Sequence, residues 1–282
     1  MMLSGKKTIQ LKLKGGEKLG AQDLTILSIA SLLVFLIPVL YINRRLKLTI
    51  NKTIGTSIFR MCVQLSFVGI YLEFLFKYNS PILNIIYLLV MISIACQSIL
   101  KASNLKVLKL FIPVFFSLLI PFTIILFFFN AVVARIDNLF EAKYLIPIGG
   151  MLLGNCLRSI IIGLNNFYSG IKKDEKVYIY SLSLFSSRIP SLKPYFKESI
   201  IASITPTIAS MATIGLVSLP GMMTGQILGG SIPIVAIKYQ IAIMLCIFYT
   251  EYFSTILSVL FSLKIGFNDL DVLNQDIFIS KG

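Results

Sequence analysis

Long apolar stretches recur along the chain and define its organisation. A helix needs about 20 largely apolar residues to cross the hydrocarbon core of a bilayer. Seven stretches approach or exceed this length: residues 24–42, 55–76, 82–100, 107–129, 144–167, 199–223 and 232–263. Backbone amides in lipid must be satisfied within the spanning segment, and the alternating strands of a membrane barrel are not evident. We therefore predict an all-α, polytopic integral membrane protein with about seven transmembrane helices, in which residues 24–263 form one membrane domain.

Three more polar segments flank or interrupt the predicted spans. Residues 1–23 form a basic N-terminal tail, residues 168–198 form the longest connection, and residues 264–282 form a C-terminal tail. A connection of about 30 residues is too short for a catalytic domain. It is long enough for one or two short helices at the membrane surface.

The composition supports a membrane protein. Of the 282 residues, 56% are hydrophobic and 13% are charged, whereas an ordinary soluble domain has about 25% charged residues. This balance excludes a soluble globular enzyme, a disordered chain and a collagen-like chain. The net charge of +14 is more typical of basic cytoplasmic loops than of nucleic-acid binding in so apolar a chain.

The distribution of Lys and Arg predicts the orientation in the membrane. If all seven stretches cross, fifteen Lys and Arg residues lie on one side, in loops 43–54 and 101–109, the connection and the C-terminal tail. Eight lie on the other side, and five of these belong to the N-terminal tail. We therefore predict a multi-pass protein of the cell membrane with a cytoplasmic C-terminus, to which the basic N-terminal tail is the discordant feature.

Several kinds of chemistry find no support in the sequence. The chain has no His, and its four Cys (Cys62, Cys96, Cys156 and Cys246) stand alone in apolar stretches, where we expect them to be small buried hydrophobes. The sequence has no P-loop, no HExxH and no GxSxG motif. We predict that the chain is not an enzyme, has no catalytic residues and binds no cofactor itself.

Polar side chains inside the predicted spans are candidates for a transport path, because they are costly in lipid. The candidates are Arg60, Gln64, Asn155, Arg158, Asn165, Asn166 and Glu251. Glu251 is the acidic partner expected for the two arginines. For the Asn residues, interhelical hydrogen bonding and a substrate path are equal alternatives. Two stripes with helical spacing, Ser203-Thr207-Ser210 beside Pro206 and Glu251-Ser254-Ser258, are more typical of packing surfaces.

A Gly- and Pro-rich segment follows the sixth apolar stretch. Its candidate functional residues are Gly215, Ser218, Pro220, Gly221, Met222, Met223 and Gly225. Such residues break a helix, and broken backbone at membrane depth is tolerated where it lines a cavity or is buried in protein. The alternative is a plain turn between two spans.

Three blocks of sequence resemble the FetB/YbbM-type permeases. The first is GLVSLPGMM at residues 215–223, with Thr224, Gly225 and residues 236–241 after it. The second combines residues 146–148, 150–151 and 154–155 with Asn165 and Asn166, and the third is residues 63–65 with Gly69. Further matching positions are Pro206, Lys238, Tyr239 and Gln240. The resemblance covers nearly all of residues 55–263, and its family comprises membrane subunits of a bacterial ABC transporter assigned to iron export, related to plant aluminium-sensitivity proteins.

This resemblance implies a permease subunit that exports iron or another metal. It implies a homodimer in the lipid bilayer and a separate ATP-binding cassette subunit that uses ATP, with no role for nucleic acid. The coupling region to the ATPase would comprise Leu182, Ser183, Leu184, Phe185, Ser186 and Ser187, where Phe185 replaces a glycine of the family.

Two other functions are compatible with the sequence. An ion-coupled secondary transporter would need no ATPase, and a membrane enzyme or scaffold would need no transport path. Without His, a transported metal would be met by oxygen atoms, Cys or the Met222 and Met223 thioethers, or would travel as a complex.

Overall fold

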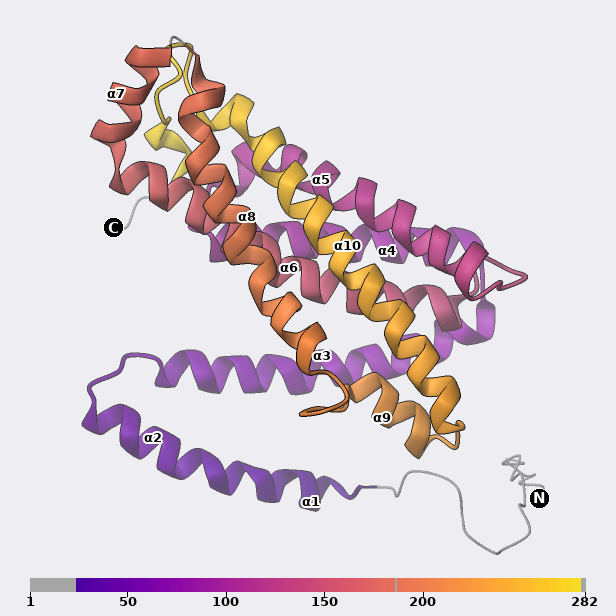
Figure 1. The fold of residues 1–282 in the computed structure, drawn as a ribbon. Helices are drawn as coiled ribbons and strands as arrows, with labels where there is room; N and C mark the ends of the chain where they lie inside the picture. Colours follow the sequence, from indigo (N-terminus) through magenta and orange to yellow (C-terminus); the bar gives the residue numbers. More distant parts are fainter. Residues whose placement is uncertain (1–23, 186, 280–282) are drawn as a thin grey trace, which may run out of the picture. The chain divides into compact units, whose positions relative to one another are not determined.

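The computed structural model describes residues 24–185 and 187–279 (Figure 1). The predicted N-terminal tail of residues 1–23, Ser186 and residues 280–282 lie outside the described residues. The described part of the chain consists of helices and their connections, and its only β-type pairings are isolated bridges. The predicted all-α class is confirmed.

Six helical stretches of the described residues are long and apolar enough to cross a membrane. They are Ile26–Arg45, Asn51–Tyr78, Pro81–Ala102, Val107–Val133, Ala142–Lys173 and Pro233–Gly266. A chain with this many such helices is a polytopic membrane protein, as the apolar pattern predicts.

The chain divides into two compact units. Unit 1 holds residues 24–74 and Pro220–Lys238, and unit 2 holds Leu75–Leu219 and residues 239–279. Two long helices, α3 (Asn51–Tyr78) and α10 (Pro233–Gly266), contribute residues to both units.

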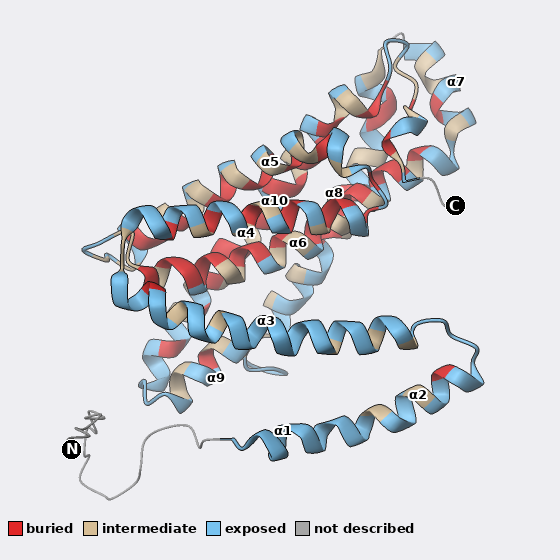
Figure 2. Ribbon diagram, turned by 180° about the vertical axis from the view of Figure 1, so that it is seen from behind, coloured by how far each residue is buried: buried red, intermediate tan, exposed pale blue. Residues whose placement is uncertain are grey.

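Unit 1 contains little buried surface. α1 (Ile26–Ser31), η1 (Leu32–Phe35) and α2 (Leu36–Arg45) follow one another closely, and a turn leads into α3. The side-chain amide of Asn43 donates to Asn51 Oδ1 at 2.7 Å across this turn. α9 (Gly221–Leu228) precedes α10. Most apolar side chains of α1 to α3 are exposed in the single chain (Figure 2), as expected for helices whose outer surface meets lipid or another subunit.

Unit 2 contains the core of the protein. It comprises α4 (Pro81–Ala102), α5 (Val107–Phe128), the π-helical η2 (Phe129–Val133), α6 (Ala142–Lys173), α7 (Glu175–Phe185), α8 (Arg188–Thr213), most of α10 and η3 (Gln275–Ile277). α6 packs against α4, α5, α7 and α8. Its buried side chains, among them Leu152, Ile160 and Phe167, make it the central helix of the unit (Figure 2).

Buried hydroxyl pairs connect the helices of unit 2. Ser117 of α5 pairs with Ser258 of α10 at 2.7 Å, Ser159 of α6 with Thr255 of α10 at 3.0 Å, and Tyr168 of α6 donates to Ser262 of α10 at 2.7 Å. We call these six residues the hydroxyl seam. All six are buried, and pairing satisfies polar groups that would otherwise lie unpaired in a nonpolar environment.

One glycine lets the helices approach closely along the seam. A Cβ atom built on Gly163 of α6 would lie 2.5 Å from Cγ2 of Thr255. The Gly163 carbonyl accepts a hydrogen bond from Ser199 Oγ of α8 at 2.7 Å. The absence of a side chain at this position therefore sets the distance of α6 from both α8 and α10.

The C-terminal segment, residues 267–279, folds back onto one end of unit 2. Asp271 contacts both α7 and α8. Its backbone carbonyl accepts a hydrogen bond from Tyr178 Oη at 2.7 Å, and its carboxylate forms an ion pair with Arg188 at 3.2 Å. Burial of Tyr178 of α7 in this contact raises the pKa of its phenol to about 12.

Backbone hydrogen bonds attach the same segment to the α4–α5 turn. Lys106 N donates to Ile277 O at 2.7 Å, and Ile279 N donates to Asn104 O at 2.9 Å. Three basic regions that we predicted to share one side of the membrane, loop 101–109, the connection 168–198 and the C-terminal tail, therefore meet at one end of this unit.

The sixth predicted span does not form one continuous helix. α8 begins at Arg188, ends at Thr213, and is followed by a turn before α9. Gly215 in this turn has φ +85°, a conformation that favours glycine. α8 also carries Lys193, Lys197 and Glu198 in its first half, so it is more polar than the six stretches above.

One cysteine differs from the expectation. Cys96, Cys156 and Cys246 are buried, but Cys62 is exposed. The prediction of four buried cysteines is wrong at Cys62, because this residue lies on α3, whose side chains make few contacts within unit 1.

Candidate functional site

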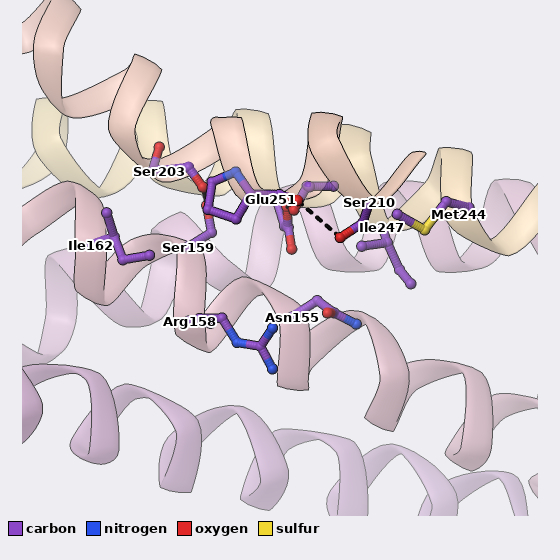
Figure 3. A pocket seen from close by; sticks show the side chains of 11 residues that line it. Asn155, Arg158, Ser159, Ile162, Ser203, Ser210, Met244, Ile247 and Glu251 are labelled. Atoms are coloured by element: carbon purple, nitrogen blue, oxygen red, sulfur yellow. Dashed lines mark hydrogen bonds between the residues drawn. The ribbon is translucent and has the colours of Figure 1, made fainter. Parts of the chain in front are cut away.

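A polar pocket lies between α6, α8 and α10 in unit 2 (Figure 3). Its cavity volume is about 60 Å³, so it has room for a small ion or one or two water molecules. It is lined by Asn155, Arg158, Ser159 and Ile162 of α6, by Ser203, Pro206, Thr207 and Ser210 of α8, and by Met244, Ile247 and Glu251 of α10. The residues of α6 and α10 lie near the middle of helices long enough to span a membrane.

Glu251 is the acidic side chain of this pocket. The residue is 2% exposed, and Thr207 Oγ1 donates a hydrogen bond to Glu251 Oε2 at 2.5 Å (Figure 3). Within the described residues, no donor reaches Oε1, the second carboxylate oxygen. Because a carboxylate at membrane depth is costly, one with an unsatisfied oxygen facing a cavity is a candidate for ligand binding.

Three neutral side chains of the pocket donate hydrogen bonds to backbone carbonyls of their own helices. Asn155 Nδ2 donates to Met151 O at 2.9 Å, Ser210 Oγ to Pro206 O at 2.9 Å, and Ser203 Oγ to Ile200 O at 2.8 Å. These bonds use the hydroxyl hydrogens of Ser203 and Ser210 and one of the two amide hydrogens of Asn155. The amide and hydroxyl oxygens remain available as acceptors or as metal ligands.

Arg158 is the basic side chain of the pocket, and it is exposed. The two ion pairs formed by the described residues are Lys109–Asp276 and Arg188–Asp271. The expected direct ion pair between Arg158 and Glu251 is therefore wrong: Glu251 uses the Thr207 hydroxyl, and Arg158 lies on the α6 side of the pocket (Figure 3).

The other candidates for the transport path do not line this pocket. Asn165 and Asn166 lie further along α6, and Asn166 Nδ2 donates to Ile162 O of its own helix at 2.9 Å. Arg60 and Gln64 are exposed residues of α3 in unit 1.

The Gly- and Pro-rich segment includes the turn that separates α8 from α9. Gly215 N donates to Ser218 O at 2.9 Å in the turn that follows α8, which belongs to unit 2. Pro220 is the N-cap of α9. The remaining candidates, Gly221, Met222, Met223 and Gly225, belong to α9 in unit 1, where Met223 is buried.

The predicted coupling region forms the corner between α7 and α8. Leu182, Ser183, Leu184 and Phe185 make the last turn of α7, and Ser187 is the N-cap of α8. Leu184 is 63% exposed and Phe185 57% exposed, so this corner presents apolar side chains at the end of unit 2.

The remaining family-matching positions have separate surroundings. Pro206 lines the pocket, and Lys238 is exposed on α10. The Tyr239 ring lies 6.5 Å from the Phe129 ring, centroid to centroid. Gln240 is buried, and its Oε1 has no hydrogen-bond partner among the described residues.

Thr207, Ser210 and Ser203 line the pocket but were not among the predicted site residues, because their stripe is more typical of packing. Their helical spacing beside Pro206 was the only feature of the sequence that set them apart. Whether these side chains face Glu251 depends on how α8 and α10 align, which the sequence does not reveal. Among the described residues, no group of three or more Cys, Asp or Glu side chains is arranged to hold a metal ion.

Comparison with known proteins assigns the family. The model described as Uncharacterised protein family (UPF0014) matches residues 26–267. The chain belongs to the UPF0014 family. This confirms the resemblance stated from the sequence blocks, since relatives of the chain include a FetB protein of Escherichia coli and a plant aluminium-sensitivity protein.

Three relatives illustrate the similarity. The chain is 30% identical to the UPF0014 membrane protein YjkA of Bacillus subtilis, over 77% of this chain and 86% of YjkA. It is 30% identical to the "Probable iron export permease protein FetB" of Escherichia coli, over 85% of this chain and 91% of FetB. It is 29% identical to the protein ALUMINUM SENSITIVE 3 of Arabidopsis thaliana, over 76% and 77%. No solved structure matches the chain.

Proposed function

We propose that this chain is the membrane-spanning permease subunit of an ABC transporter that exports iron or another metal. A separate ATP-binding subunit would supply the energy, and two permease chains would form the transport unit in the cell membrane, with the C-terminus in the cytoplasm. The proposal draws its metal and its direction from the name of the FetB relative.

The polar pocket beside Glu251 is the observation that carries the proposal. Transporters commonly hold their substrate near the middle of the bilayer, between helices that can move against one another. The pocket lies between three helices, near the middle of α6 and α10, and contains a buried carboxylate. Neither lipid contact nor helix packing requires a carboxylate with a free oxygen at this position.

The α7–α8 corner supports the ATPase part of the proposal. Leu184 and Phe185 expose apolar surface at the end of unit 2, where a soluble subunit can reach them. α8 begins at this corner and continues to the pocket residues Ser203, Thr207 and Ser210. A displacement of the corner by a docked ATPase would therefore be transmitted along α8 to the pocket.

A co-purification tests the proposal. The tagged chain is extracted gently from its native host, and the proteins that accompany it are identified. We expect a stoichiometric ATPase with a P-loop, which is lost in the double variant Leu184→Ser/Phe185→Ser. Val177→Ser is the matched control, since Val177 is an exposed apolar residue near the other end of α7.

The opposite result favours the ion-coupled alternative. If the chain is extracted alone even after cross-linking, and vesicles containing only this chain transport metal when an ion gradient is applied, the ABC assignment is wrong.

A further inference from the structure

The Glu251 pocket offers oxygen acceptors on three sides. Among the described residues Glu251 Oε1 receives no hydrogen bond, Asn155 directs one of its two amide hydrogens at Met151 O, and Thr207 directs its hydroxyl hydrogen at Glu251. The oxygens of Asn155 and Thr207 therefore keep unused lone pairs. These three oxygens suit a ligand that provides positive charge or hydrogen-bond donors.

The volume limits the ligand to a small one. A cavity of about 60 Å³ holds one or two water molecules or an ion of similar size. A metal bound to an organic chelator with several carboxylates is larger than this space.

The kind of donor atom points to a class of cation. Carboxylate, amide and hydroxyl oxygens are hard ligands, which suit Mg²⁺, Ca²⁺ and Mn²⁺, whereas thiolates and thioethers suit soft cations. The pocket contains one sulfur atom, that of Met244. Three oxygen-bearing side chains from α6, α8 and α10 outnumber it.

We propose that the Glu251 pocket binds one small, oxygen-preferring metal cation through Glu251, Asn155 and Thr207. The proposal rests on the proposed transport function in that the bound cation would be the cargo, and it adds which residues hold the cargo and which class of cation they accept. One carboxylate with neutral oxygens gives a weak site, as transport requires, because the ion must also leave.

Arg158 has a separate role at this site. Arg158 is exposed and lines the same cavity, so its charge repels a cation in the pocket. The positive charge of Arg158 also offsets the negative charge of Glu251 when the pocket is empty. Removing Arg158 should therefore tighten the binding of a bare cation and weaken the binding of an anionic complex.

Mn²⁺ binding to the purified full chain tests the proposal. The chain is stripped of metal in detergent, and free Mn²⁺ is followed by its electron paramagnetic resonance signal. We expect wild-type protein to bind Mn²⁺, and Glu251→Gln to weaken that binding by about tenfold or more. The Gln side-chain oxygen can still accept from Thr207, and thermal unfolding verifies that the variant is folded.

Matched variants identify the other two ligands. Asn155→Leu and Thr207→Val should each weaken Mn²⁺ binding. Asn166→Leu and Thr205→Val should leave it unchanged, because these residues lie on the same helices, each donates to a backbone carbonyl of its own helix, and neither lines the pocket. Met244→Leu should also leave Mn²⁺ binding unchanged.

Three results would overturn the proposal. The first is equal Mn²⁺ affinity in wild type and Glu251→Gln, which would place bound Mn²⁺ elsewhere. The second is loss of binding in Met244→Leu, which would indicate a soft cation. The third is weaker binding in Arg158→Gln, which should instead bind Mn²⁺ more tightly, by about tenfold.

This test is independent of the ATPase. Mn²⁺ binding that depends on Glu251, in a chain that co-purifies with no ATPase, would refute the ABC assignment and leave the cation site standing. If an ATPase co-purifies and Mn²⁺ binding is equal in wild type and Glu251→Gln, the ABC assignment stands and the cation site is refuted.

Discussion

The hydroxyl seam and the Glu251 pocket are two polar regions on the same helix, α10, and they differ in how completely their groups are paired. In the seam, each hydroxyl meets another across a helix interface at 2.7–3.0 Å. In the pocket, Asn155, Ser203 and Ser210 donate within their own helices, and Glu251 Oε1 receives no hydrogen bond from the described residues. Ser159 belongs to both regions. Paired groups stabilise packing, whereas unpaired ones cost stability unless a ligand satisfies them. The seam is thus structural, and the pocket is suited to binding.

Gly163→Ala should produce the largest effect, because it forces apart the helices of the seam. The new Cβ would lie 2.5 Å from Thr255 Cγ2, and overpacking of this kind costs about 3 kcal/mol. Thermal unfolding in detergent measures the loss. Gly154→Ala is the control on the same helix, because nothing lies within 4 Å of a Cβ at that position.

A second substitution tests the cause of that loss. Thr255→Ser removes Cγ2 and keeps the hydroxyl that pairs with Ser159. The double variant Gly163→Ala/Thr255→Ser should recover most of the stability. If it stays as unstable as Gly163→Ala alone, close approach at Thr255 is not what limits the packing.

Glu251→Gln should shift stability in the opposite direction. Replacing a buried charge by a neutral group of the same shape removes a desolvation penalty, and we expect a gain of about 1 kcal/mol. The metal-free protein must be compared, since a bound ion would stabilise the wild type. A clear loss of stability would place Glu251 with the structural groups of the seam.

Ser117→Ala and Ser258→Ala should each have a smaller effect. A hydrogen bond between membrane helices contributes about 0.6 kcal/mol, and the double variant should lose less than the sum of the two single losses. Mn²⁺ binding should stay the same in all three. Additive losses would show that the two hydroxyls do not act as a pair.

Tyr178→Phe should have the smallest effect, since its hydrogen bond to Asp271 O lies at the end of unit 2, where water competes. We expect a loss of about 0.5 kcal/mol. The raised pKa gives the sign of the pH dependence: the neutral phenol is favoured when folded, so its contribution is complete below pH 10 and is lost as the pH rises toward 12.

The difference in phenolate absorbance between wild type and Tyr178→Phe measures this pKa. The difference should titrate near pH 12. A midpoint near 10 would mean that the Tyr178 side chain is solvated and that the C-terminal segment does not cover it.

The sequence predicted the helices well because the membrane imposes a strong local constraint. Apolar stretches of sufficient length are visible without any knowledge of tertiary contacts. The interruption after α8 was also visible, since Gly215 and Pro220 act locally on the backbone. The start of α8 at Arg188 was not predicted, because polar residues that precede an apolar stretch can continue a helix beyond the membrane.

The pocket was only partly predictable. Asn155, Arg158 and Glu251 stood out because each is costly in lipid. Thr207 did not, because threonine is common in packed membrane helices, and its bond to Glu251 depends on the alignment of α8 with α10. The same alignment gives Glu251 a hydroxyl partner in place of the expected Arg158.

The C-terminal segment also affects the order in which the protein can be completed. Leu105 pairs with Phe278, and Lys106 and Asn104 bond to Ile277 and Ile279, so the α4–α5 turn is finished by residues made roughly 170 positions later. At a synthesis rate of about 5–20 residues per second, this turn waits roughly 10–35 s for its partners. Until then its backbone groups must be satisfied by water or by a chaperone, which makes this turn a point where assembly in the cell is vulnerable.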